Sequence, residues 1–270
     1  MEHPCAFDSV RRVPELLDLR FDAAPGREAL LFVHGLGADR TQFDAEHEAF
    51  ADDYQVVSVS LRGHGGSRHS GRGPWSLEQL AQDVLAVLEA LKLPAVHYVG
   101  NSMGGNVAFE LLRLAPSRLR SLTTFGTTAQ LNTARPLLPL LRMVYRGLPA
   151  RWRGLLAGSV GRTPEASSKI SAMASQTPRR TILALLPALA RFDYRPSLAD
   201  AVLPISIIRG EHDTEINRAL DGTLATLRAR KHGTFRLHEL GGAGHFANLD
   251  RPRPFADVLR TILRDVENGD

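Results

Sequence analysis

The stretch that decides the fold is Val96-His97-Tyr98-Val99-Gly100-Asn101-Ser102-Met103-Gly104-Gly105. Residues 96–100 form an apolar run typical of a buried strand, and residues 103–114 carry the apolar spacing of a helix. Between them, residues 100–104 fit the pattern G-x-S-x-G. Glycines at both ends allow a sharp turn that lifts the serine hydroxyl off the end of a sheet. The stretch therefore predicts strand, tight turn and helix, with Ser102 at the helix N-terminus, where serine is also favoured simply as a cap.

Strands and helices alternate on both sides of this turn. The predicted strands are residues 29–33, 55–61, 119–125, 204–209 and 234–240, and the predicted helices are residues 76–92, 215–231 and 254–264. An antiparallel hairpin is expected near residues 10–21. Regular alternation favours a mostly parallel sheet, of about eight strands, with helices on both faces. The fold class predicted is therefore α/β.

The alternation stops for about 70 residues after Phe125. This segment is punctuated by prolines, namely Pro136, Pro139, Pro149, Pro164, Pro178, Pro187 and Pro196. We interpret residues 128–196 as a helical lid inserted into a core formed by residues 1–127 and 197–270. Residues 135–195 contain 11 Lys and Arg against two acids, Glu165 and Asp193. This basic segment is either a solvated face or a surface that attracts an anionic substrate.

A serine hydroxyl is a weak nucleophile that needs a base, which a carboxylate orients in turn. Asp213 follows the predicted strand at residues 204–209, and His245 follows the strand at residues 234–240. Both lie in loops at strand ends, where ligands collect in open parallel sheets. Glu211 is the alternative acid, and no Asp or Glu occurs between Leu119 and Gln130. The order Ser102, Asp213, His245 predicts a catalytic triad.

Four motifs in this order resemble the α/β-hydrolase family with a lid. Beside the Ser102 turn, the matching stretches are His34-Gly35-Leu36-Gly37, Arg62-Gly63-His64-Gly65-Gly66-Ser67, Gly210 to Asp213 and Gly244-His245-Phe246. The resemblance implies that the backbone N–H groups of Leu36 and Met103 form the oxyanion hole. His34 ends a predicted strand and His64 lies in the arginine loop, so we interpret both as structural hydrogen-bonding groups rather than catalytic residues. Ser60 departs from the pattern, because relatives often carry an acid two residues before the arginine of this loop.

The resemblance leaves several reactions open. The Gly-Asn-Ser-Met-Gly-Gly turn looks like that of carbon–carbon bond hydrolases of ring-cleavage products, whereas the general layout is equally similar to enol-lactonases and carboxylesterases. We expect hydrolysis of an ester-like bond (ester, lactone or thioester) through an acyl-enzyme. The alternatives are a carbon–carbon hydrolase, an acyltransferase, a ligand receptor that bears the triad, and a lyase or oxygenase.

The composition of the chain limits the classes of cofactor and partner that we expect it to bind. The 270 residues are 43% hydrophobic and contain one cysteine, Cys5, and the sequence has no Cys/His cluster with zinc-site spacing. No cofactor or metal is therefore expected, and His97 and His212 are interpreted as satisfied or exposed side chains. No apolar run approaches the ~20 residues that span a bilayer, and no secretory signal precedes the core, so a cytoplasmic location is expected. The expected partner is a small acyl or ester substrate, possibly anionic, and neither nucleic acid nor membrane; monomer and homodimer both remain open.

Overall fold

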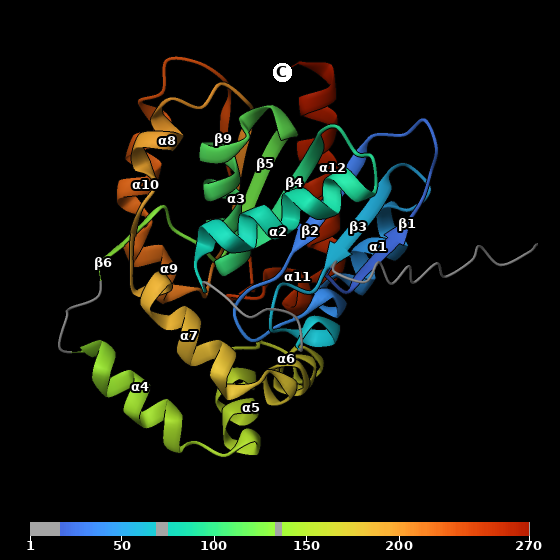
Figure 1. Cartoon of the computed structure of the whole chain (residues 1–270). Coiled ribbons are helices and arrows are strands. Elements are labelled where there is room, and N and C mark those ends of the chain that lie inside the picture. The colour runs from blue at the N-terminus through green and yellow to red at the C-terminus, as the bar shows by residue number, and fades with distance from the viewer. Residues whose placement is uncertain (1–16, 69–74, 133–136, 270) are drawn as a thin grey trace, which may run out of the picture.

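The computed structural model describes residues 17–68, 75–132 and 137–269 (Figure 1). Cys5 and the first part of the predicted hairpin lie outside these ranges. Seven strands form one sheet in the order β1-β3-β2-β4-β5-β8-β9. Their bounds are β1 Leu19–Asp22, β2 Ala29–Val33, β3 Gln55–Val59, β4 Val96–Asn101, β5 Leu119–Phe125, β8 Ile205–Gly210 and β9 Phe235–Leu240. Every pairing is parallel except β1 with β3, which confirms the mostly parallel sheet.

The sheet differs from expectation at its first edge. The described residues contribute seven strands to it rather than about eight. β1 does not form a hairpin with a preceding strand in the described residues; it pairs antiparallel with β3, so that Leu19 lies opposite Val59. This pairing covers the edge of β3 that β2 leaves free, so the sheet satisfies those backbone groups with a strand from the beginning of the chain.

Helices cover both faces of the sheet (Figure 1). One face carries α2 Leu77–Ala90, α3 Met103–Leu114, α8 Arg195–Ala199 and α10 Asp221–Arg228, and the other carries α1 Asp44–Phe50 and α12 Pro252–Asn268. α2 begins as predicted, because the Ser76 hydroxyl accepts a hydrogen bond from the Gln79 N–H at 3.1 Å. The apolar stripes of these helices pack on buried strand residues and form two core layers.

The predicted lid contains four helices that lie together at one end of the sheet (Figure 1). They are α4 Leu137–Gly147, α5 Ala150–Gly158, α6 Pro164–Gln176 and α7 Arg179–Ala190. A two-stranded antiparallel ribbon, β6 Gln130–Asn132 with β7 Arg191–Asp193, joins the points where this segment leaves and rejoins the core. The ribbon was not predicted, because strands of three residues carry too little periodicity to be recognised.

Two helix predictions need correction. Pro187 lies inside α7 rather than ending a helix. Proline has no N–H, so α7 lacks the backbone bond from residue 187 to the carbonyl of the preceding turn, and the helix ends three residues later, at Ala190. The helix predicted over residues 215–231 is divided into α9 Thr214–Ala219 and α10, with Leu220 between them.

Short elements complete the chain. They are the 3₁₀ turns η1 Arg40–Phe43, η2 Gly65–Ser67 and η3 Pro116–Arg118, and α11 Ala247–Asp250. In the described ranges, no helix combines the length and apolar character that crossing a bilayer requires.

Candidate active site

Ser102 occupies the sharp turn between β4 and α3. Its backbone has φ 51° and ψ −118°, a conformation that residues with a side chain rarely adopt. The two glycines of the motif make the turn possible: a Cβ on Gly100 would lie 2.7 Å from the Gly104 carbonyl, and a Cβ on Gly104 would overlap the Val33 carbonyl oxygen. The Ser102 N–H donates to the Phe125 carbonyl at 2.9 Å, which ties the turn to β5.

His245 and Asp213 meet across the loops that follow β9 and β8. The Nδ1 atom of His245 lies 3.0 Å from Oδ2 of Asp213, and the Asp213 side chain is only 8% exposed. Glu211, the alternative acid, instead accepts the backbone N–H of Gly242 at 2.8 Å, and its Oε2 lies 3.7 Å from Nε2 of His212. The acid that contacts His245 is therefore Asp213.

Ser102 and His245 line one cavity of about 200 Å³ beneath the lid segment. Its other lining residues are Gly35, Leu36, Gly37, Ala38, Ala157, Val160, Ile170, Met173, Ala174 and Phe246. They come from the loop after β2, from α5 and the turn that follows it, from α6, and from the residue after His245. Among these lining side chains, His245 is the one that can carry a charge, so the cavity offers an apolar environment around a serine and a histidine.

The backbone N–H groups of Leu36 and Met103 are free in the described structure. Leu36 lies in the loop after β2 and lines the cavity, and neither its N–H nor that of Met103 has an acceptor among the described residues. Met103 is the first residue of α3, where N–H groups lack intrahelical partners. Two donors without an acceptor among the described residues therefore lie near Ser102, one in the loop after β2 and one at the first residue of α3.

His34 and His64 lie behind the cavity and are fully buried. His34 Nδ1 donates to the Gly35 carbonyl at 2.7 Å, and its Nε2 accepts the Leu61 N–H at 2.9 Å. Burial lowers the pKa of His34 to about 4 and that of His64 to about 3. Both imidazoles are therefore neutral near pH 7, and His34 bridges the loop after β2 to the loop after β3.

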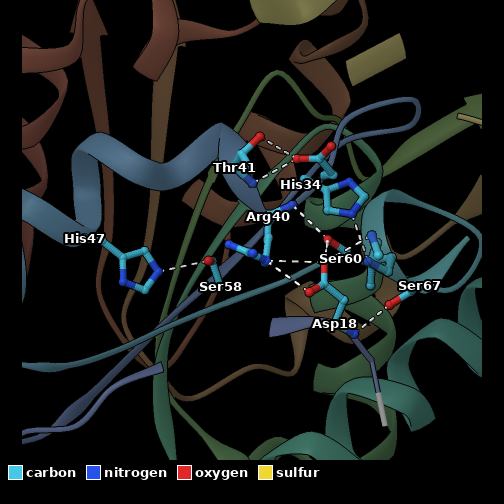
Figure 2. A network of polar contacts seen from close by, with 11 residues as sticks. Asp18, His34, Arg40, Thr41, His47, Ser58, Ser60 and Ser67 are labelled. Atoms are coloured by element: carbon cyan, nitrogen blue, oxygen red, sulfur yellow. Dashed lines mark hydrogen bonds and ion pairs between the residues drawn. The ribbon is translucent and has the colours of Figure 1, made fainter. Parts of the chain in front are cut away.

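Asp18 supplies the carboxylate that is missing at Ser60 (Figure 2). Its Oδ2 accepts hydrogen bonds from the Ser60 hydroxyl at 2.9 Å and the Gly66 N–H at 3.1 Å. Arg40 Nε donates to both oxygens of Asp18, at 3.2 and 3.3 Å, and the Arg40 N–H donates to Ser60 Oγ at 3.2 Å. An acid from the segment before β1 thus joins the Arg62 loop to the loop after β2.

Two further residues hold His245 and were not predicted. Asn101 Nδ2 donates to the His245 carbonyl at 3.0 Å, so the residue beside Ser102 fixes the histidine backbone. Asp250, which is 3% exposed, accepts the N–H of Gly244 at 2.8 Å and the N–H of Arg162 at 2.7 Å. Asn101 stands inside the recognised motif and Asp250 five residues after His245, but only the folded chain shows their partners.

The fold agrees with what the chain resembles. A family model described as alpha/beta hydrolase fold matches residues 28–190, and the chain belongs to that family. A relative, 3-oxoadipate enol-lactonase 2 of Acinetobacter baylyi, is 28% identical over 244 residues, covering 88% of this chain and 89% of the relative. The pimeloyl-[acyl-carrier protein] methyl ester esterase of Aeromonas hydrophila is also 28% identical, covering 90% and 97% of the two chains. A thermophilic esterase from Thermogutta terrifontis superposes with a TM-score of 0.79 at 25% identity, covering 96% and 97%.

The contacts of Asp18 predict that a carboxylate placed at residue 60 compensates for the loss of the one at residue 18. Asp18→Ser should lower the free energy of unfolding by about 2 kcal/mol, because Ser60, Gly66 and Arg40 lose a charged acceptor. Ser60→Asp alone should also destabilise, because it places a second carboxylate beside Asp18. The double variant keeps one carboxylate in the network. Its free energy of unfolding should therefore be higher than the sum of the two single effects predicts.

Urea unfolding of the wild type, both single variants and the double variant measures this coupling. Asp52→Ser, at an exposed position, is the control and should stay within about 0.5 kcal/mol of the wild type. Simple additivity of the two single effects would contradict the interpretation.

Proposed function

We propose that the chain hydrolyses ester-like bonds (ester, lactone or thioester), with Ser102 as nucleophile, His245 as base and Asp213 as the acid that orients it. The observation that carries this proposal is the apolar cavity lined by both Ser102 and the histidine that Asp213 holds. A Ser102 oxygen raised at a helix N-terminus and an imidazole fixed through Nδ1 are what acyl transfer to serine needs.

The reaction then follows from these positions. Ser102 Oγ attacks the substrate carbonyl carbon while His245 Nε2 accepts the hydroxyl proton. The tetrahedral oxyanion accepts hydrogen bonds from the N–H groups of Leu36 and Met103. On collapse, the bond to the leaving group breaks and His245 returns the proton to that group. Water, deprotonated by His245, attacks the acyl-enzyme in the same way and releases the acid.

The relatives support the class of bond. Two of them are by name an enol-lactonase and a methyl ester esterase, and both are similar to this chain over most of their length. A lactone and a methyl ester share an acyl carbon bonded to oxygen. We therefore favour carboxylic ester or lactone cleavage over carbon–carbon bond cleavage.

The cavity limits the size and charge of the acyl group that the chain can accept. Its volume of about 200 Å³ lies below the roughly 300–1,000 Å³ typical of small-molecule sites. Met173, 4% exposed, contributes to its wall from α6, in the segment that we propose to act as a lid. A short, uncharged acyl chain fits these walls, because a charge buried there would have no partner other than the histidine.

A negative charge at the remote end of the substrate would meet Arg162. The Arg162 side-chain stem packs against Gly244, the residue before His245, and Arg162 stands two residues after the cavity-lining Val160. Its guanidinium is exposed and forms no ion pair with any described residue. We propose that Arg162 attracts substrates whose far end carries a carboxylate.

The nucleophile is tested with Ser102→Ala. This variant should lower kcat/KM for p-nitrophenyl butyrate by at least about 10³-fold while the protein stays folded, because no other group can form the acyl-enzyme. Ser159→Ala, at an exposed lid serine, is the matched control and should keep wild-type activity. Folded wild type without turnover would overturn the hydrolase assignment and favour a ligand receptor, and acyl products formed only with added thiols or alcohols would favour an acyltransferase.

The cavity wall is tested with Met173→Ala. The wild type should prefer p-nitrophenyl acetate and butyrate to octanoate, and Met173→Ala should raise kcat/KM for octanoate relative to acetate because the cavity becomes longer. Leu185→Ala is the control: Leu185 is a fully buried residue of α7 that does not line the cavity. An unchanged chain-length profile in Met173→Ala would contradict the placement of the acyl group.

Arg162 is tested with two butyrate esters of similar shape, 4-carboxyphenyl butyrate, whose negative charge lies on the alcohol side, and the neutral 4-carbamoylphenyl butyrate. Arg162→Gln should raise KM about two- to fivefold for the anionic ester alone, since an exposed ion pair contributes up to about 1 kcal/mol. The difference should shrink at high salt. Arg151→Gln, at another exposed lid arginine, is the control. Equal changes for both esters would remove Arg162 from substrate selection.

A further inference from the structure

Three side chains with metal-binding atoms meet at the end of the sheet opposite Ser102. Glu28 directly precedes β2, His97 is the second residue of β4, and Glu267 lies in the last turn of α12. One ligand atom from each lies within 4.8 Å of the others. His97 is 2% exposed, and its Nε2 lies 2.6 Å from Glu28 Oε2.

Each of the three side chains is held at a second atom by another residue. His97 Nδ1 lies 2.9 Å from the Ser121 hydroxyl, which leaves Nε2 directed at the carboxylates. Arg120 pairs with Glu28 Oε1 at 2.8 Å, on the oxygen opposite the one that faces His97. The Tyr54 hydroxyl donates to Glu267 Oε1 at 2.5 Å. Outer partners of this kind orient the ligands in metal sites of proteins.

We propose that Glu28, His97 and Glu267 bind one divalent transition metal ion of the Zn²⁺ class. One imidazole nitrogen and two carboxylate oxygens suit Zn²⁺, with bonds of roughly 2.0–2.2 Å and a water molecule at the fourth position. The ion replaces the proton shared between His97 and Glu28, which is released to solvent. It also neutralises the two carboxylates. Among the described residues, Arg120 forms an ion pair with one of the two, Glu28.

One of the three proposed ligands, Glu267, is exposed, and a bound ion has a structural consequence there. Tyr54 and Glu267 line a surface cavity of about 370 Å³ together with Arg27, Asp53, Arg260 and Arg264. Because the ligands come from the residue before β2, from β4 and from the C-terminal helix, a bound ion would fasten the last turn of α12 to the sheet. Binding to the folded chain alone raises the free energy of unfolding. The site is remote from the Ser102 cavity, so hydrolysis does not depend on it.

Calorimetric titration of the full chain with ZnCl₂ tests the proposal, with CoCl₂ as a spectroscopic probe. We expect one ion per chain, visible Co²⁺ absorption bands of a low-symmetry site, and a higher Tm with Zn²⁺. Glu267→Gln changes an exposed residue and keeps an oxygen for Tyr54, so it should fold normally and weaken binding at least about tenfold. His97→Gln should abolish the Co²⁺ bands, and Tyr54→Phe should weaken binding although Tyr54 is not a ligand.

Exposed histidines provide the control. His232→Gln and His212→Gln should leave the stoichiometry and Kd for Zn²⁺ unchanged. The proposal is overturned if no saturable binding occurs. It is equally overturned if Glu267→Gln binds as the wild type does, or if binding is lost in a control variant instead. Activity of the wild type on p-nitrophenyl butyrate, with and without Zn²⁺, is read separately and does not decide the outcome.

Discussion

The left-handed backbone of Ser102, with φ 51°, is held in place by contacts from several parts of the sheet. A residue in such a conformation costs about 1–3 kcal/mol, so the surroundings must impose it. Gly104 lies directly against the Val33 carbonyl, and the Ser102 N–H is bound by Phe125, so β2 and β5 both hold the turn. Asn101, the neighbouring residue, then binds the His245 carbonyl. One turn therefore fixes both the serine and the histidine that shares its cavity.

Buried or half-buried carboxylates hold the loops around this turn. Asp213 fixes the ring of His245, and Asp250 fixes its backbone through Gly244. Asp250 also accepts the N–H of Arg162, so the histidine loop and the predicted lid share one anchor. Asp18 likewise connects the segments after β2 and β3, because it accepts hydrogen bonds from Arg40 and from Ser60. Because loop residues carry the chemistry in this fold, such anchors replace the rigidity that a strand or helix would give.

The sequence predicted what local patterns encode. Regular apolar spacing located α2, α3 and β5 within a few residues, and the order of motifs pointed to the hydrogen-bonded pair of Asp213 and His245. It could not predict the role of Asp18, because that acid reaches Ser60 from the segment before β1, 42 residues earlier in the chain. The proposed metal ligands Glu28, His97 and Glu267 were not predicted for the same reason: no sequence spacing joins a residue before β2, a residue of β4 and a residue of the last helix.

The central claim is that Ser102 is the nucleophile in a folded, activated site. Treatment of the native chain with a fluorophosphonate, followed by intact-mass measurement and peptide mapping, tests it most directly. The account predicts one phosphonyl group per chain, on the peptide that contains Ser102, and no label after the protein is denatured before treatment. No adduct on the native protein, or an adduct on another residue, would contradict it.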